Sequence, residues 1–266
     1  TYDETRCKEV QPMHAGLDED WADVAQAWML QFLDEELLAS WGKPDTSDNV
    51  YSDMATALAQ PGHYSRAWTV RHSDRRANKV TGPDGLMIRC GYPSRMIYTE
   101  RYAWGLGDYA LHIQATAGDK VHFRPVSPDK LRVIGSHEDP SVPVELWELQ
   151  WRFVPAFGGE MWCYDHYSIR PGREPFFRIE AAEEAVDPTD AGKRIEIYTD
   201  LTENILGTKS GPWEPYVGDG YPWKTEDGSP LIPYPILRTV DSGKTWNYTA
   251  RHGAYRATLG ICQIST

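Results

Sequence analysis

Two settings among the eight histidines of this chain could support proton transfer or metal binding. Asp165 precedes His166, which places a carboxylate next to an imidazole, but neighbouring residues on a strand point to opposite faces and cannot act as a pair. His112 and His122 flank a predicted hairpin turn and could face each other across it. Because acid/base catalysis also needs a third partner and a pocket, we favour a structural role for both histidines.

The remaining signals for chemistry are weak. Glu145 and Glu148 are three residues apart, which separates them on a strand, whereas a glycosidase needs two carboxylates held ~5 to 9.5 Å apart. The sequence contains no G-x-S-x-G, H-E-x-x-H, P-loop or EF-hand pattern. Its cysteines are scattered without a C-x-x-C pair, and we interpret them as small buried hydrophobes: Cys7, Cys90, Cys163 and Cys262. We therefore assign no catalytic, cofactor-binding or metal-binding residue.

The most ordered pattern in the sequence runs from Met96 to Arg132. A helical face repeats at three- or four-residue spacing and ends at two glycines: Tyr98, Arg101, Tyr102 and Leu106, then Gly105 and Gly107. Apolar residues then alternate with others, as on a strand with one buried face: Tyr109, Leu111 and Ile113. A turn over residues 117–119 and a second strand follow. This stretch predicts a helix, a strand, a tight turn and a strand.

The N-terminal part predicts helices. Residues Thr1 to Gly16 have little pattern and are expected to form an arm, and a broad apolar stripe from Leu17 to Trp41 predicts a helix. A short helix is predicted over Tyr51 to Ala59, with Ser47 or Ser52 as its N-cap. Leu86 to Arg89 is expected to be a strand.

The rest of the chain predicts β-structure with short turns, hence an antiparallel sheet. The expected strands are Leu131–Ile134, Val144–Val154, Met161–Ile169, Phe176–Ile179 and Ile195–Tyr198. Glu180 to Asp190 is expected to be a loop or one helical turn, and Thr208 to Pro230 a long Gly/Pro/Trp loop. The prolines of Gly228–Arg238 predict an extended edge segment, and Gly253–Thr266 carries a helical pattern.

These elements predict an α+β fold, in which N-terminal helices precede a mostly antiparallel β-sheet domain and a C-terminal helix begins at the chain end. We expect three parts: an N-terminal arm and helices over residues 1–62, a β-rich domain over 63–240 that includes the loop at 208–230, and the start of a helical segment over 241–266.

Composition narrows the function classes. The formal charge is −12, from 39 acidic and 27 basic residues, which argues against a protein whose main task is to grip phosphate backbones. The one basic cluster, residues 71–79, lacks interleaved aromatics, so we interpret it as a solvated loop. No stretch predicts a membrane span or a secretion signal. Eleven Trp and fifteen Tyr indicate extensive interfaces or aromatic platforms for a ligand such as sugar.

The stretch from Met96 to Arg132 resembles the wing region of the portal proteins of tailed bacteriophages. In that family a helix closes on a Gly-x-Gly-Asp-like turn, and a strand and a hairpin lead to a segment like Arg124-Pro125-Val126-Ser127-Pro128-Asp129-Lys130-Leu131. A second stretch is similar to the place where several portal wings pass into long helices: Gly228 to Leu237, then Lys244-Thr245-Trp246, then a small-residue helix from Gly253. Both occur in the expected order.

The resemblance implies a structural protein and not an enzyme: one subunit of a homo-oligomeric ring of about twelve copies at a capsid vertex. Such a ring forms the channel for DNA packaging and ejection and contacts capsid protein, terminase and a head-tail adaptor, while double-stranded DNA passes without sequence-specific binding. The implied location is the virion, with the host cytoplasm during assembly and no membrane. The resemblance implies channel-lining helices beyond Thr266, so either the sequence is a fragment of a longer protein or the resemblance misleads. We name no DNA-contacting residue.

Two other classes remain open. A β-rich carbohydrate-binding protein or glycoside hydrolase would explain the aromatics and the acidity, and it predicts outward-facing Trp213 and Trp223 that stack on sugar rings. Another structural virion protein, such as a head-tail adaptor, would share most of the features of a portal subunit.

Overall fold

A computed structural model describes residues 4–18, 21–31, 35–36, 49–59, 86–116, 120–187, 190–206, 221–240, 242–246 and 255–259. The chain is an α+β protein with N-terminal helices and mostly antiparallel sheets, as the sequence predicts. It divides into two compact units that interleave along the sequence. Unit 1 comprises Thr1–Gln114, Val121–Asp129 and Tyr234–Thr266, and unit 2 comprises Ala115–Lys120 and Lys130–Pro233. The two units are defined by contacts between residues, whereas the three parts predicted above are consecutive ranges of the sequence.

Unit 1 is built on helices that share one apolar core. They are α1 (Glu4–Leu17), α2 (Trp21–Met29), α4 (Val50–Ala59), α6 (Leu86–Arg89) and α7 (Tyr92–Leu106), and residues 255–259 add a further helical turn. The buried side chains of this core come from every one of these helices except α6 and from the first strand: Val10, Met13, Leu17, Ala25, Met29, Tyr51, Ala55, Tyr102, Ala103, Leu106, Tyr109, Tyr255 and Leu259. The helical pattern predicted near the C-terminus is therefore present at Tyr255 and Leu259, which join this core.

Three local predictions for this part of the chain are wrong. Residues 4–17 form helix α1 and not an arm, because Val10, Met13 and Leu17 recur at helical spacing and are buried, although polar residues surround them. The helix predicted from Leu17 to Trp41 is also wrong in its bounds, because α2 runs only from Trp21 to Met29 and a turn follows at residues 30–31. Residues 86–89 are the short helix α6 and not a strand, since four residues are too few for periodicity to separate the two.

The predicted helix after residue 50 is confirmed, but its cap differs. The side chain of Asn49 accepts a hydrogen bond from the backbone N–H of Ser52 at 3.0 Å, so Asn49 caps α4. Ser52 lies inside the helix, and its hydroxyl donates to the backbone carbonyl of Leu17 at 3.3 Å. Ser47 lies outside the described residues.

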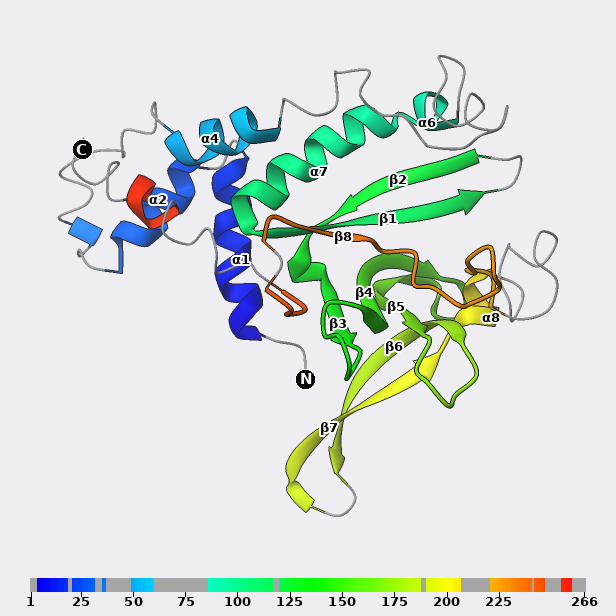
Figure 1. Ribbon diagram of the computed structural model, residues 1–266. Coiled ribbons are helices and arrows are strands. Elements are labelled where there is room, and N and C mark those ends of the chain that lie inside the picture. The colour runs from blue at the N-terminus through cyan, green and yellow to red at the C-terminus, as the bar shows by residue number, and fades with distance from the viewer. Residues whose placement is uncertain are drawn as a thin grey trace, which may run out of the picture. The chain divides into compact units, whose positions relative to one another are not determined.

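Helix α7 leads directly into a sheet, as predicted (Figure 1). Gly107 ends the helix with a positive φ of 96°, and its N–H donates to the carbonyl of Ala103 at 2.8 Å. Among the described residues, β1 (Asp108–Thr116) is the middle strand between β2 (Lys120–Val126) and β8 (Ile236–Arg238). The short β8 lies at the sheet edge, as expected for a proline-rich segment.

Strand β1 is buried on both faces, whereas the sequence predicts one buried face. Tyr109 packs in the helical core, and on the other face His112 stacks on Tyr234 with 4.0 Å between ring centroids. Ala110 is also buried. A middle strand covered on both sides loses the alternation on which the prediction rests.

Unit 2 is organised by a five-stranded antiparallel sheet in the order β3-β4-β5-β6-β7. The strands are β3 (Leu131–Gly135), β4 (Pro143–Val154), β5 (Gly159–Ser168), β6 (Phe176–Asp187) and β7 (Asp190–Asp200). The 3-10 turn η1 (Pro128–Lys130) precedes β3, and a second 3-10 turn, η2 (Pro155–Phe157), joins β4 to β5. The short helix α8 (Thr202–Leu206) follows β7. All five predicted strands are confirmed. The prediction of a loop or helical turn over residues 180–190 is wrong, because β6 continues to Asp187 and pairs with β7 in a long hairpin (Figure 1).

One face of this sheet carries the apolar core of unit 2. Val154, Cys163 and Ile179 come from three adjacent strands and are buried with Ala181 and Leu201. The side chains of Ile205 and Leu206 from α8 pack against them. The opposite face holds the polar and aromatic groups described next.

Candidate functional site

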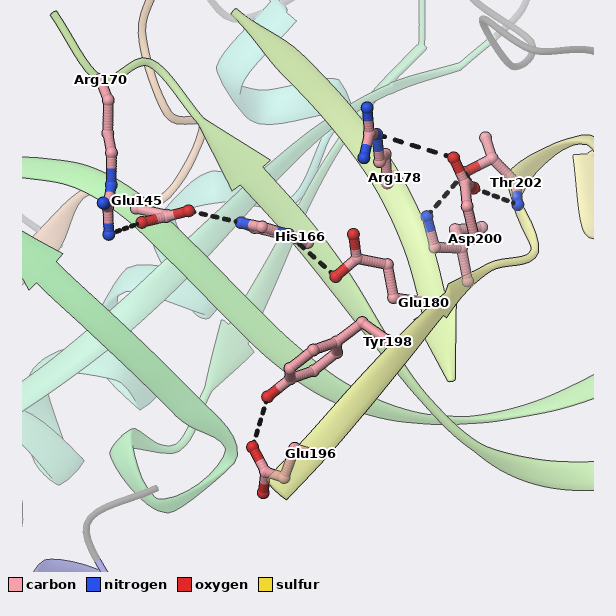
Figure 2. Close-up of polar contacts among 10 residues, drawn as sticks. Glu145, His166, Arg170, Arg178, Glu180, Glu196, Tyr198, Asp200 and Thr202 are labelled. Carbon is pink, nitrogen blue, oxygen red and sulfur yellow. Dashed lines mark hydrogen bonds and ion pairs between the residues drawn. The ribbon is translucent and has the colours of Figure 1, made fainter. Parts of the chain in front are cut away.

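Three buried polar side chains form a continuous chain across the sheet of unit 2 (Figure 2). Glu145 on β4, His166 on β5 and Glu180 on β6 are each less than one-tenth exposed. The imidazole Nε2 lies 2.8 Å from a carboxylate oxygen of Glu145, and Nδ1 lies 2.9 Å from a carboxylate oxygen of Glu180. We call Glu145, His166 and Glu180 the polar chain; it ties together three adjacent strands.

Aromatic rings and arginines fix the polar chain from its sides. Trp147 stacks on the imidazole of His166 with 4.2 Å between ring centroids, and the guanidinium of Arg132 lies over the Trp147 ring, 4.7 Å from its centroid. Phe176 meets the imidazole edge-on at 4.9 Å. Arg170 forms an ion pair with the second carboxylate oxygen of Glu145. The imidazole therefore has one position and one orientation.

The hydrogen bonds of the polar chain require shared protons, but they leave no nitrogen of His166 for a substrate. An ionised carboxylate only accepts hydrogen bonds, and a neutral imidazole has only one N–H, so two such contacts need a proton on both ring nitrogens or on one carboxyl group. Because carboxylates occupy both ring nitrogens, neither nitrogen is available to a substrate. The polar chain is thus a buried cross-link between strands, and its chemistry resembles a structural ion network more than a catalytic site.

The face of the sheet that carries the apolar core of unit 2 also carries a second polar cluster. Arg152 lies 2.5 Å from a carboxylate oxygen of Asp165, and the amide nitrogen of Gln150 donates to both Asp165 and Glu148, at 2.9 and 3.0 Å. Asp165 and His166 thus lie on opposite faces, as the sequence predicts. Glu145 and Glu148 are separated in the same way, so neither pair supports a two-residue mechanism.

The two histidines of the β1–β2 hairpin have different surroundings. The guanidinium of Arg124 donates to Nδ1 of His112 at 2.7 Å, and the buried ring of His112 stacks on Tyr234. His122 is exposed on β2. His112 therefore contacts Arg124 and Tyr234.

Burial changes the acidity of several tyrosines. In unit 1, burial raises the pKa of Tyr255 to about 12. Burial and, to a smaller extent, the electrostatic effect of Tyr255 also raise the pKa of Tyr51. In unit 2, burial and then the hydrogen bond to Glu196 raise the pKa of Tyr198. These phenols stay protonated near neutral pH. Tyr51 and Tyr255 pack in the helical core, and Tyr198 donates a hydrogen bond to Glu196.

Large aromatic side chains gather at one end of the β4–β5 hairpin. Trp151 and Trp162 are directly opposite each other in the strand register and are each 52% exposed, Phe153 is 56% exposed, and Phe157 in η2 is 62% exposed. The two indoles meet edge to face at 5.1 Å, and the Trp151 N–H donates to Glu160 at 2.7 Å. We call Trp151, Phe153, Phe157 and Trp162 the aromatic tip.

The aromatic tip and the polar chain were not identified from the sequence. Their residues are scattered over more than thirty positions, and only the strand register brings them together. A signal was present in the β4–β5 connection, where Gly158 has a positive φ of 63° after a one-turn 3-10 helix. The register that this turn sets places Trp151 opposite Trp162.

The tryptophans proposed as sugar platforms give no support to that use. Trp213 lies outside the described residues. Trp223 is partly buried, and its indole nitrogen is buried without a hydrogen-bond partner in the described part of the chain. The basic cluster of residues 71–79 also lies outside the described residues.

Comparison of the sequence with models of protein families finds no match, and comparison with curated proteins finds none either. Within the described ranges, no three His, Cys, Asp or Glu side chains are grouped as metal ligands. No described helix is both long enough and apolar enough to cross a membrane.

Proposed function

We propose that this chain is the wing part of a portal subunit of a tailed bacteriophage, a structural protein that assembles into a ring at one capsid vertex. The observation that carries the proposal is the pairing of β1 with β8. Asp108 pairs with Arg238, Tyr109 with Leu237 and Ala110 with Ile236. The backbone N–H of Thr239 also donates to the carbonyl of Gly107 at 3.1 Å.

This pairing joins the two stretches that carry the resemblance to portal proteins. One contains the helix, the Gly-x-Gly-Asp turn and the hairpin, and the other contains the proline-rich segment that ends in β8. More than one hundred residues separate β1 from β8 in the sequence, yet the two strands pair in one sheet. Two separately weak similarities that meet in one structural element support the proposal more strongly than either does alone.

Charge and surface composition also support an assembly role. A net charge of −12 suits a channel wall that lets DNA slide without tight binding. Exposed aromatics such as the aromatic tip suit contacts between proteins, because Trp and Phe are enriched in interface cores. In this proposal the whole ring forms the channel, and the whole ring contacts the capsid protein, the terminase and the tail.

The proposal is tested by the mass of the native assembly. Mass photometry of the purified protein, or subunit counting in class averages of the particle, should give a closed ring of about twelve copies. A protein that stays monomeric at micromolar concentration would contradict the proposal.

A carbohydrate-binding function is the second candidate, because exposed tryptophans such as Trp151 and Trp162 can stack on sugar rings. The same sample can test it by isothermal titration with soluble bacterial polysaccharides. Saturable binding by a monomer, abolished by Trp151→Ala, would favour this candidate over the portal subunit. Absence of binding by an assembled ring would favour the portal subunit.

A further inference from the structure

The geometry of the polar chain fixes the number of protons that it holds (Figure 2). His166 lies 2.8 Å from an oxygen of Glu145 and 2.9 Å from an oxygen of Glu180, so both contacts are direct. Each contact needs one hydrogen, because two acceptor atoms without a hydrogen between them do not bond. A neutral imidazole between two carboxylates supplies only one. The polar chain therefore holds two protons, either both on the ring or one on the ring and one on a carboxyl group.

The balance of buried charge favours the same number of protons. All three residues of the polar chain are less than one-tenth exposed, and an unbalanced charge at such a position is costly. Arg170 pairs with the second carboxylate oxygen of Glu145 and supplies one positive charge. With two protons the polar chain has a single negative charge, which Arg170 balances. Removal of one proton leaves a second negative charge that Arg170 does not balance.

Two further arginines on this face of the sheet contact aromatic rings that pack on His166. Arg132 of β3 lies over the Trp147 ring, and Arg178 of β6 lies over the Phe176 ring at 4.5 Å from its centroid. Arg178 also lies 3.6 Å from a carboxylate oxygen of Asp200 on β7. Both arginines thus meet the imidazole through an aromatic side chain. Among the described residues, Arg170 is the cation that the structure pairs directly with a carboxylate of the polar chain.

We propose that the polar chain is a pH-sensitive cross-link of the sheet of unit 2: it joins β4, β5 and β6 while it holds two protons, and loss of one proton breaks one of its two bonds. One remaining hydrogen cannot bridge both nitrogens of His166 to their carboxylates, so β5 then loses its side-chain bond to β4 or to β6. The proposal goes beyond assembly and is independent of it, because all of these groups lie within unit 2 of one chain.

The direction of the pH dependence follows from the protons bound by the folded and the unfolded chain. In the unfolded chain both carboxylates are ionised near neutral pH, and an imidazole loses its second proton near about pH 6.5. Above that pH the folded protein holds one more proton than the unfolded chain, so stability decreases as the pH rises. Between about pH 5 and 6.5 the contribution of the cross-link is complete. Tyr164, which pairs with Glu180 in the strand register, adds nothing to this change, because burial raises the pKa of its phenol.

Glu180→Gln separates the cross-link from the extra proton. The glutamine amide donates to Nδ1 of His166 while Nε2–H donates to Glu145, so this variant forms both bonds with a single ring proton. Urea unfolding followed by circular dichroism from about pH 6 to about pH 9 compares the folding constants of the full chain. Relative to Glu180→Gln, the folding constant of the wild type should fall by up to about tenfold per pH unit above neutral pH. Glu183→Gln, the same change at an exposed position of β6, is the matched control and should follow the wild type.

Nuclear magnetic resonance of isotope-labelled histidine and glutamate side chains counts the protons in the wild type near neutral pH and needs no variant. The His166 signals are assigned through the contact of its ring with Trp147. Two protonated ring nitrogens, or one together with a protonated carboxyl group of Glu145 or Glu180, give the expected count of two. A count of one would overturn the proposal. Parallel pH profiles of the wild type and Glu180→Gln, or a Glu183→Gln profile that follows Glu180→Gln, would overturn it as well.

Discussion

Substituting Gly105 by alanine should destabilise unit 1, although alanine favours a helix. Gly105 lies in the last turn of α7 and is buried. A Cβ at this position would lie 2.8 Å from Cδ2 of Leu17 and 3.1 Å from its Cγ, and closer still to Cδ1. Carbon atoms normally pack at about 3.5 to 4.0 Å, so the methyl group overlaps the leucine side chain. Leu17 is fully buried and has no solvent into which it could move.

The magnitude follows from two opposing effects. Replacing glycine by alanine inside a helix gains up to about 1 kcal/mol. Overpacking a core costs about 1 to 3 kcal/mol, and this overlap is severe enough for the upper end of that range. We expect a net loss of about 2 kcal/mol for Gly105→Ala. Leu17→Ala alone should cost about 2 to 5 kcal/mol, because it leaves a cavity.

The double variant is the decisive measurement. In Leu17→Ala/Gly105→Ala the added methyl group enters the space that the leucine vacates, so its loss should be smaller than the sum of the single losses by about 2 kcal/mol or more. Urea unfolding followed by circular dichroism measures all three variants. Gly159→Ala in unit 2, where a Cβ meets nothing within 4 Å, is the control and should combine additively with Leu17→Ala. A neutral Gly105→Ala, or additive losses in the double variant, would refute this description of the α1–α7 contact.

Three further predictions follow from local contacts. His166→Phe should cost about 3 to 5 kcal/mol in urea unfolding, because two buried carboxylates of the polar chain lose their shared partner; a loss below about 1 kcal/mol would show that the network is not a cross-link. Gly135→Ala should lower the melting temperature, because the added Cβ would lie 2.7 Å from Cα of Pro140 and closer still to the carbonyl oxygen of Pro140. Gly159→Ala, the control, should leave the melting temperature unchanged. Equal melting temperatures of the two variants would contradict this close approach. Burial raises the pKa of Tyr255 from 10.0 to about 12, so the protonated phenol contributes stability that is complete below pH 10 and is lost between pH 10 and 12. Against Tyr255→Phe, the wild type should lose stability in that window, and parallel pH profiles would refute the shift.

Local sequence signals determined the elements whose patterns are strong and uninterrupted. Helix α7 follows from apolar spacing and from the glycine at residue 107, whose positive φ ends it. The strands of unit 2 follow from β-favouring residues between turns. The edge position of β8 follows from the prolines that precede it. Proline has no backbone N–H, so a proline-rich segment cannot form hydrogen-bond ladders with a strand on each side.

Tertiary contacts decided the elements whose patterns are weak. Helix α1 has few apolar residues and contains Pro12, yet it forms because Val10, Met13 and Leu17 are buried in the shared core. The acidic end of β6 has low strand propensity, but pairing with β7 supplies the hydrogen bonds that a loop would not. Propensity is a small energy per residue, and packing or pairing over a whole element outweighs it.

The sites depend on register, which no single stretch of sequence contains. The amino-acid sequence alone places Glu145 and His166 on strands and predicts that Asp165 and His166 face opposite sides, but it places Glu180 in a loop or helical turn, whereas Glu180 lies on β6. Which residues stand beside each other across β4, β5 and β6 depends on the turns, because a shift of one residue moves every side chain to the other face. The polar chain and the aromatic tip therefore exist only in the folded sheet, where hydrogen-bonded pairing brings distant residues within contact distance.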